Sequence, residues 1–181
     1  IMPKYTVSNF LGDARDIIAD SGVDEGLEDI RINMEQMLQE PSFLDDNVDL
    51  NEHTGFTVVG QDEETDIYVI VHGGKKASSS SPHDHGPCSV IYGNLNNHTV
   101  MRRWTRVDDG GDTGPAELEM ANEYTVNAGE ASAFARGAIH SIEYPDNTYF
   151  VRVTVGDVER QHTHMYDVTN STVRFALRTK E

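Results

Sequence analysis

From residue 55 onward the chain consists of short runs rich in β-branched and aromatic residues, and this pattern restricts the fold more than any other feature. About eight such runs are present, at residues 56–59, 67–72, 89–92, 98–105, 124–126, 131–134, 149–155 and 173–177. Segments rich in glycine, asparagine and aspartate separate them, and these residue types favour turns. The pattern predicts an all-β barrel or sandwich over residues 55–178.

The first fifty residues follow a different pattern, in which apolar residues recur at roughly helical spacing among acidic ones. The Asp-Ser-Gly sequence at 20–22 interrupts this spacing, and Pro41 disfavours helical geometry in the residue before it. The segment 1–50 is therefore predicted to form a pair of α-helices ahead of the barrel. A chain of 181 residues is expected to form a single domain, residues 1–181.

Charge and cysteine content indicate which partners the chain can bind and in which compartment it is expected. The chain has 31 acidic against 14 basic residues, a formal net charge of -17, which repels phosphate backbones and anionic lipid headgroups. We therefore expect no nucleic acid and no membrane surface as partner. Cys88 is the single cysteine, so no intrachain disulfide can form, and no stretch approaches the ~20 apolar residues that span a bilayer. These features predict a cytoplasmic location.

Two histidines are placed as metal ligands would be. The segment 82–86 reads Pro-His-Asp-His-Gly, and strand alternation would direct His83 and His85 to the same side, into the barrel. A neutral imidazole binds a metal through one nitrogen while an acceptor holds its other N–H. Asp84 or Glu143 could supply that acceptor.

Residues 129–140 add a third histidine in a matching context: a turn, a short strand, a second turn and then His140. This segment resembles the second motif of the cupin family, which has a glycine, a five-residue spacer, a Pro-x-Gly turn and a histidine after two more residues. Ala135 replaces the usual proline, and Tyr144 replaces the usual final asparagine.

The first cupin motif is matched by His83-x-His85 and loosely by Gly93. Its acidic ligand would fall at residue 89 or 90, which are serine and valine. The resemblance therefore implies a three-histidine site, His83, His85 and His140. It also implies a mainly β fold, the cupin double-stranded β-helix or jelly-roll barrel, with an N-terminal pair of α-helices.

Within the cupins the chain resembles the thiol dioxygenase branch, the cysteine dioxygenase and 3-mercaptopropionate dioxygenase group. The Pro-His-Asp-His-Gly segment, the nearby Cys88 and Tyr-Gly-Asn-Leu at 92–95 carry this likeness. It implies a non-haem Fe(II) centre that adds both atoms of O2 to a bound small molecule, first of all a thiol that becomes a sulfinate. Ni, Mn or Zn remain alternative metals, and a homodimer is left open.

Other residues are candidates for substrate handling. That group has a tyrosine after the third ligand and an arginine that clamps the substrate carboxylate, and neither is found at its expected place here. Arg152 and Arg160 are candidates to replace the arginine, and each has a surface role as its alternative.

Tyr92 and Tyr166 are catalytic candidates, because each could donate a hydrogen bond to bound oxygen. Trp104 either lines the cavity or packs against a helix, and Cys88 is expected as a small side chain near the site. The neighbouring arginines of the 101–106 run are expected to face acidic surface groups, and His162-Thr-His164 is expected in a solvated turn.

Three further functions stay open at this point. The same three-histidine iron could cleave a carbon–carbon bond in a diketone. A metal such as Zn, Ni or Mn could act as a Lewis acid in an O2-independent lyase or isomerase. The chain could also be a ligand-binding cupin without activity. Three protein ligands leave coordination positions open, whereas a structural site is usually closed by four, so the pattern favours catalysis.

Overall fold

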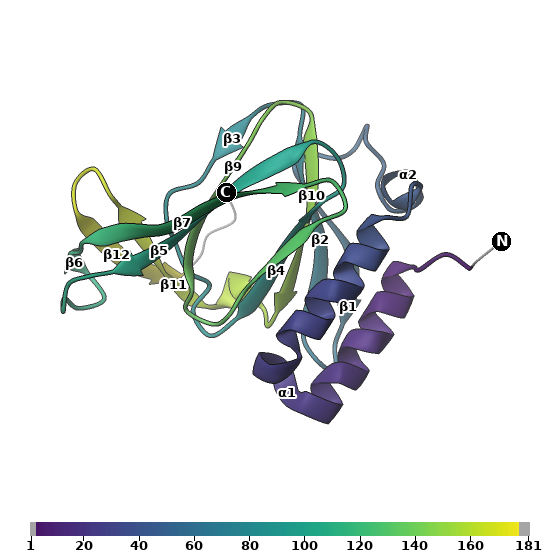
Figure 1. Ribbon diagram of the computed structural model, residues 1–181, viewed down its shortest axis with the longest axis horizontal. Helices are drawn as coiled ribbons and strands as arrows, with labels where there is room; N and C mark the ends of the chain where they lie inside the picture. The colour runs from purple at the N-terminus through teal and green to yellow at the C-terminus, as the bar shows by residue number, and fades with distance from the viewer. Residues whose placement is uncertain (1–2, 178–181) are drawn as a thin grey trace.

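The computed structural model of the chain describes residues 3–177 and is mainly β, with helices at its N-terminal end (Figure 1). The helical elements are α1 (Val7–Leu38), α2 (Phe43–Asn47) and the 3-10 turn η1 (Val158–Arg160). The strands are β1 (Phe56–Asp62), β2 (Ile67–Gly74), β3 (Ser78–Ser79), β4 (Ser89–Asn94), β5 (His98–Arg106), β6 (Gly114–Pro115), β7 (Leu118–Asn127), β8 (Ala131–Phe134), β9 (Ile139–Tyr144), β10 (Thr148–Val155), β11 (His162–Asp167) and β12 (Thr172–Leu177). Residues 1, 2 and 178 of the predicted helical and barrel ranges lie outside the described residues.

The strands form three sheets, in which every pairing is antiparallel. The orders are β1-β2-β10-β4-β8, β3-β9-β5-β7 and β11-β12-β6. Apolar side chains from β4, β8 and β10 pack against others from β5, β7 and β9 in one buried cluster, which includes Tyr92, Met101 and Phe134. The space between the two larger sheets is therefore a filled core, and the candidate site lies within it.

Helix α1 covers the outer face of the five-stranded sheet (Figure 1). Phe10, Ile30 and Met34 are fully buried there against valines of β2 and β10. Alternate residues of those strands point to the opposite side, into the space between the sheets. Strands such as β2 are thus apolar on both faces, which explains their unbroken hydrophobic sequence.

The predicted pair of separate N-terminal helices is not confirmed. The chain forms one long element, α1, and a second helix of only five residues, α2. Gly22, with φ 78°, bends α1 near its middle, and Figure 1 shows the segments on either side of this bend lying side by side. A Cβ on Gly26 would lie 2.5 Å from Cγ2 of Ile17, so glycine is needed where the two segments touch.

Strands occupy all eight of the segments predicted from β-rich composition, while β3, β6, β9 and β11 were not predicted. The missed strands are either two residues long or rich in polar residues, such as Ile-His-Ser-Ile-Glu-Tyr in β9. β3, β6 and β9 pair with strands distant in the chain, whereas β11 pairs with the next strand, β12. Within residues 3–177, no helix is both long enough and apolar enough to cross a bilayer.

Candidate metal centre

Three buried histidines converge between the sheets. His83 and His85 lie in the connection from β3 to β4, and His140 lies on β9. His83 and His140 form an antiparallel bridge in which each backbone N–H donates to the other's carbonyl over 2.9 Å, so their side chains share one face. One ring nitrogen from each of the three histidines lies within 4.8 Å of the others. The structure thus brings together the three predicted ligands.

Backbone carbonyls set the tautomers of two of these rings. Nδ1 of His83 lies 2.8 Å from the Ser81 carbonyl oxygen, and Nδ1 of His140 lies 3.1 Å from that of Ala138. A carbonyl oxygen can only accept, so Nδ1 carries a hydrogen. In the neutral form of each ring, Nε2 is therefore the nitrogen that has a lone pair for a metal.

The predicted carboxylate acceptors for these N–H groups are wrong. Glu143 accepts from Arg102 instead, on the outer face of β9. Asp84 lies between His83 and His85 and points to the opposite side, where its Oδ2 is 2.7 Å from Nδ1 of His164. Strand alternation places the side chain of a residue between two inward-facing histidines on the opposite face. Backbone carbonyls two residues before His83 and His140 accept their Nδ1 hydrogens instead.

Asp84 connects the segment that carries His83 and His85 to β11. Its Oδ1 accepts hydrogen bonds from the backbone N–H groups of Gly86 and His164, over 3.0 and 2.9 Å. The expected solvated turn at 162–164 is wrong, because this segment forms β11 and pairs with β12 along its length. Burial lowers the pKa of His164, but hydrogen bonds to Asp112 and Asp84 outweigh it, and the pKa is raised overall.

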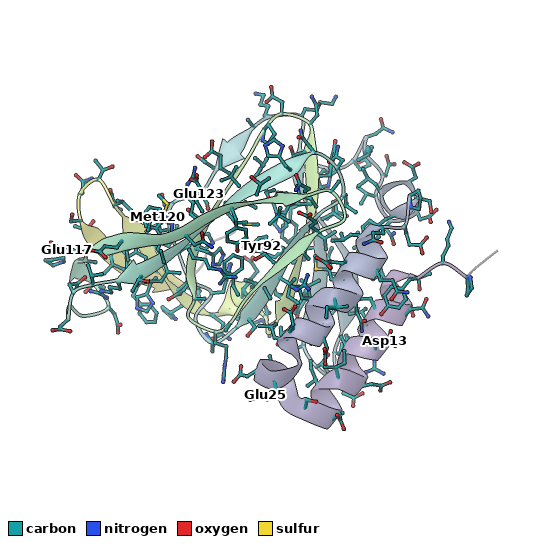
Figure 2. The ribbon with its side chains drawn as sticks, viewed as in Figure 1. Asp13, Glu25, Tyr92, Glu117, Met120 and Glu123 are labelled. Atoms are coloured by element: carbon teal, nitrogen blue, oxygen red, sulfur yellow. The ribbon has the colours of Figure 1, made fainter. Side chains whose placement is uncertain are left out.

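Of the two predicted catalytic tyrosines, the structure brings Tyr92 to the histidines. Tyr92 is 4% exposed, and Figure 2 shows it in the interior between the sheets. Its Oη lies 3.0 Å from Nε2 of His85 and 3.4 Å from Nε2 of His140. Tyr166 follows Met165, which bridges to His83, so its side chain points the other way and packs with Val173 in a separate cluster.

The two predicted substrate-binding arginines also lie in different places. Arg152 on β10 is 3% exposed and stands directly opposite Tyr92 in the β10–β4 register, so both side chains share the inner face. Its Nη2 lies 3.7 Å from a carboxylate oxygen of Glu159. Arg160 lies on η1 with its side chain 85% exposed and pairs with Asp157.

Trp104 lies outside the interior face. Its neighbour Arg103 pairs with His140 across β5 and β9, so Trp104 points to the opposite side, where Nε1 donates to Oγ of Ser141 over 3.0 Å. Cys88 is buried in the same cluster as Tyr92, and burial raises the pKa of its thiol to about 11.

Arg103 lies in the interior, where the sequence pattern did not predict it. Its guanidinium carbon lies 4.2 Å from the ring centre of Phe134, whose ring also stacks on His140 with centroids 4.2 Å apart. Nη2 donates to the Ala133 carbonyl over 2.7 Å. Arg102, by contrast, binds surface carboxylates as expected. Alternation in the sequence shows that neighbouring arginines face opposite sides, but only the register with His140 shows which one faces inward.

Comparisons with known proteins give distant structural similarity. No family model matches the chain, and no curated protein matches it at a significant level. Among solved structures, a cupin superfamily protein from Desulfitobacterium hafniense has 13% identity over 56% of this chain and 76% of that one, with a TM-score of 0.40. KdgF from Halomonas sp. has 11% identity over 59% and 84% of the two chains, with a TM-score of 0.41. An oxalate oxidase has 16% identity over 61% and 55%, with a TM-score of 0.39.

Proposed function

We propose that this chain is a cupin enzyme that binds a metal ion through His83, His85 and His140 and oxidises a small anionic substrate with O2. The first assignment is a thiol that becomes a sulfinate, as the resemblance to the thiol dioxygenase group implies. The observation that carries the proposal is the convergence of three buried imidazoles, two with their Nε2 lone pairs set by backbone carbonyls. Three such ligands leave coordination positions open for chemistry.

Neutral ligands suit an anionic substrate. Imidazole binds Fe(II), Ni and Zn well, and three imidazoles offset none of the charge of a divalent ion. We propose Fe(II) as the metal, with Ni, Mn or Zn as alternatives. When bound, a ferrous ion would supply open positions where O2 and a thiolate can react, and the electrons that reduce O2 would come from the substrate sulfur.

The chain's own residues would bind the substrate and exclude water. Arg152 faces the same interior as Tyr92, and Arg103 faces the same interior as His140, so each of the two larger sheets contributes one guanidinium group to this interior. Either can hold a carboxylate or thiolate through charge-assisted hydrogen bonds. Phe134 and Met101 are fully buried beside the site and keep water from it.

Oxygen consumption by the iron-loaded protein tests this function. With a carboxylate-bearing thiol, we expect one O2 consumed per thiol and one sulfinate formed, since both oxygen atoms enter the product. His140→Ala should abolish this uptake. Uptake with 1,3-diketones alone would instead indicate carbon–carbon cleavage, and turnover of a substrate without O2 would indicate a lyase or isomerase. Metal binding with no turnover of any of these classes would favour a ligand-binding cupin.

A further inference from the structure

The phenol oxygen of Tyr92 lies close to two of the three converging histidine rings. It is 3.0 Å from Nε2 of His85 and 3.4 Å from Nε2 of His140. We infer that Tyr92 itself coordinates the ion through its phenolate oxygen, so that the centre is formed by three histidines and one tyrosine. This inference rests on the metal centre of the proposed function and changes the role expected of Tyr92 from hydrogen-bond donor to ligand.

The distances from the Tyr92 oxygen to two of the histidine nitrogens match the spacing of atoms bonded to one ion. Ligand nitrogens and oxygens bind such metals at about 2.0–2.2 Å, so two of them at tetrahedral or octahedral angles lie about 2.9–3.5 Å apart. Both contacts of Oη fall within this range. A single phenol proton can be donated to one nitrogen at a time, whereas a cation between them would accept lone pairs from the oxygen and both nitrogens together.

Packing holds the phenol in this position. Tyr92 lies on β4, hydrogen-bonded between β8 and β10, and its ring contacts Phe134 edge-on and Phe150 at a tilt, with centroids 6.0 and 6.2 Å apart. The ring is 4% exposed, so it has little room to turn away. The oxygen is therefore presented to the histidines before any ion binds, which lowers the entropic cost of coordination.

Coordination by Tyr92 would also supply the anionic ligand that the sequence lacks where an acidic residue is expected. A phenolate would offset one charge of a divalent ion and leave the other to attract an anionic substrate. His83, His85, His140 and Tyr92 would hold the ion together.

Optical spectroscopy of the ferric protein distinguishes a ligand from a packed side chain. A phenolate bound to Fe(III) gives an intense charge-transfer absorption in the visible region, and imidazole alone gives no such absorption. We expect this absorption in the wild-type protein at one Fe(III) per chain, with phenolate vibrations in resonance Raman spectra excited within the band. In Tyr92→Phe the band should disappear, and the affinity for Zn(II) in a competition titration should fall at least about 10-fold.

Tyr124→Phe is the matched control, because Tyr124 is also an interior tyrosine but hydrogen-bonds to Ser132 over 2.6 Å. It should keep the band and the Zn(II) affinity. A wild-type protein that binds one iron without the band or the phenolate vibrations would overturn the inference and leave the three-histidine proposal intact. If the wild-type protein binds no ion at all, both fail together. The Raman measurement needs no variant, so the test does not depend on Tyr92→Phe folding.

Discussion

At the scale of single residues, hydrogen bonds of the second ring nitrogen prepare the histidines for a metal. The carbonyl oxygens of Ser81 and Ala138 hold the rings of His83 and His140 and fix which nitrogen carries hydrogen. These acceptors come from the residues two positions before each histidine. The local backbone therefore orients both rings.

Removing one ligand should separate metal binding from folding. We expect His140→Ala to abolish metal loading and turnover and to leave most of the β-sheet structure, because the apolar clusters on both sides of the five-stranded sheet remain. Metal analysis of the purified variant and its circular dichroism spectrum check this. His98→Ala, a partly buried histidine bonded to Asn97, is the control and should retain metal. Retained iron and full activity in His140→Ala would contradict the site.

Cys88 should behave as a packed residue with an unreactive thiol. Burial raises its pKa to about 11, so little thiolate is present at neutral pH, and Cys88 is 3% exposed. We expect alkylation by iodoacetamide at pH 7 to be much slower in the native protein than in the protein unfolded in urea, as followed by mass spectrometry. Cys88→Ser should change turnover only modestly. A complete loss of activity in that variant would indicate a covalent or substrate-contacting role.

At the scale of elements, an ion pair joins helix α1 to the end of β1. Arg15 on α1 bonds to Asp62, which also accepts from the backbone and hydroxyl of Thr65. The hydrogen bonds from Arg15 and Thr65 lower the pKa of Asp62 to about 2, from 3.8. The folded protein thus holds this carboxylate ionised more strongly than the unfolded chain does.

The contribution of Asp62 to stability should be present above pH 3.8 and be lost as the pH falls toward 2. We expect Asp62→Asn to lower the free energy of unfolding at pH 7 and to make it less dependent on pH between about 4 and 2. Urea denaturation at several pH values measures both effects. Asp16 is exposed on helix α1, next to Arg15. Asp16→Asn should leave the pH dependence of the free energy of unfolding nearly unchanged. If the free energy of unfolding changes equally with pH in the wild type and in Asp62→Asn, the stabilising role assigned to Asp62 is contradicted.

At the scale of the whole molecule, the excess of acidic residues sets the response to salt. With a formal net charge of -17, the folded chain repels itself, and ions screen this repulsion over about 10 Å at 0.1 M salt. We expect the melting temperature to rise when NaCl is increased from low concentration to about 1 M. Differential scanning calorimetry across this range tests it. A fall in the melting temperature would mean that salt weakens the stabilising surface ion pairs more than it screens the net repulsion.

Much of the architecture could be predicted from the sequence because strands and ligands leave local patterns. Runs rich in β-branched and aromatic residues, separated by turn residues, indicated the main strands, and the spacing in His83-x-His85 places both rings on one face of an extended segment. The helical character of the N-terminal segment and its interruption at residues 20–22 were also readable, but the structure has one long helix bent at Gly22 and a short second helix in place of the predicted pair. β9 and β11 were missed because they are rich in polar residues, some of which, such as His140, Ser141 and Thr163, are buried.

The sequence by itself determined that adjacent side chains on a strand face opposite sides, but not which side is the interior. Register between distant strands decided that Arg103 faces His140 while Trp104 faces away, and that Tyr166 lies behind the ligands. It also placed Arg152 opposite Tyr92. Register is fixed by pairing energies summed over residues far apart in the chain, so no local pattern contains it. The three histidines could be named in advance, but the residues that surround them could not.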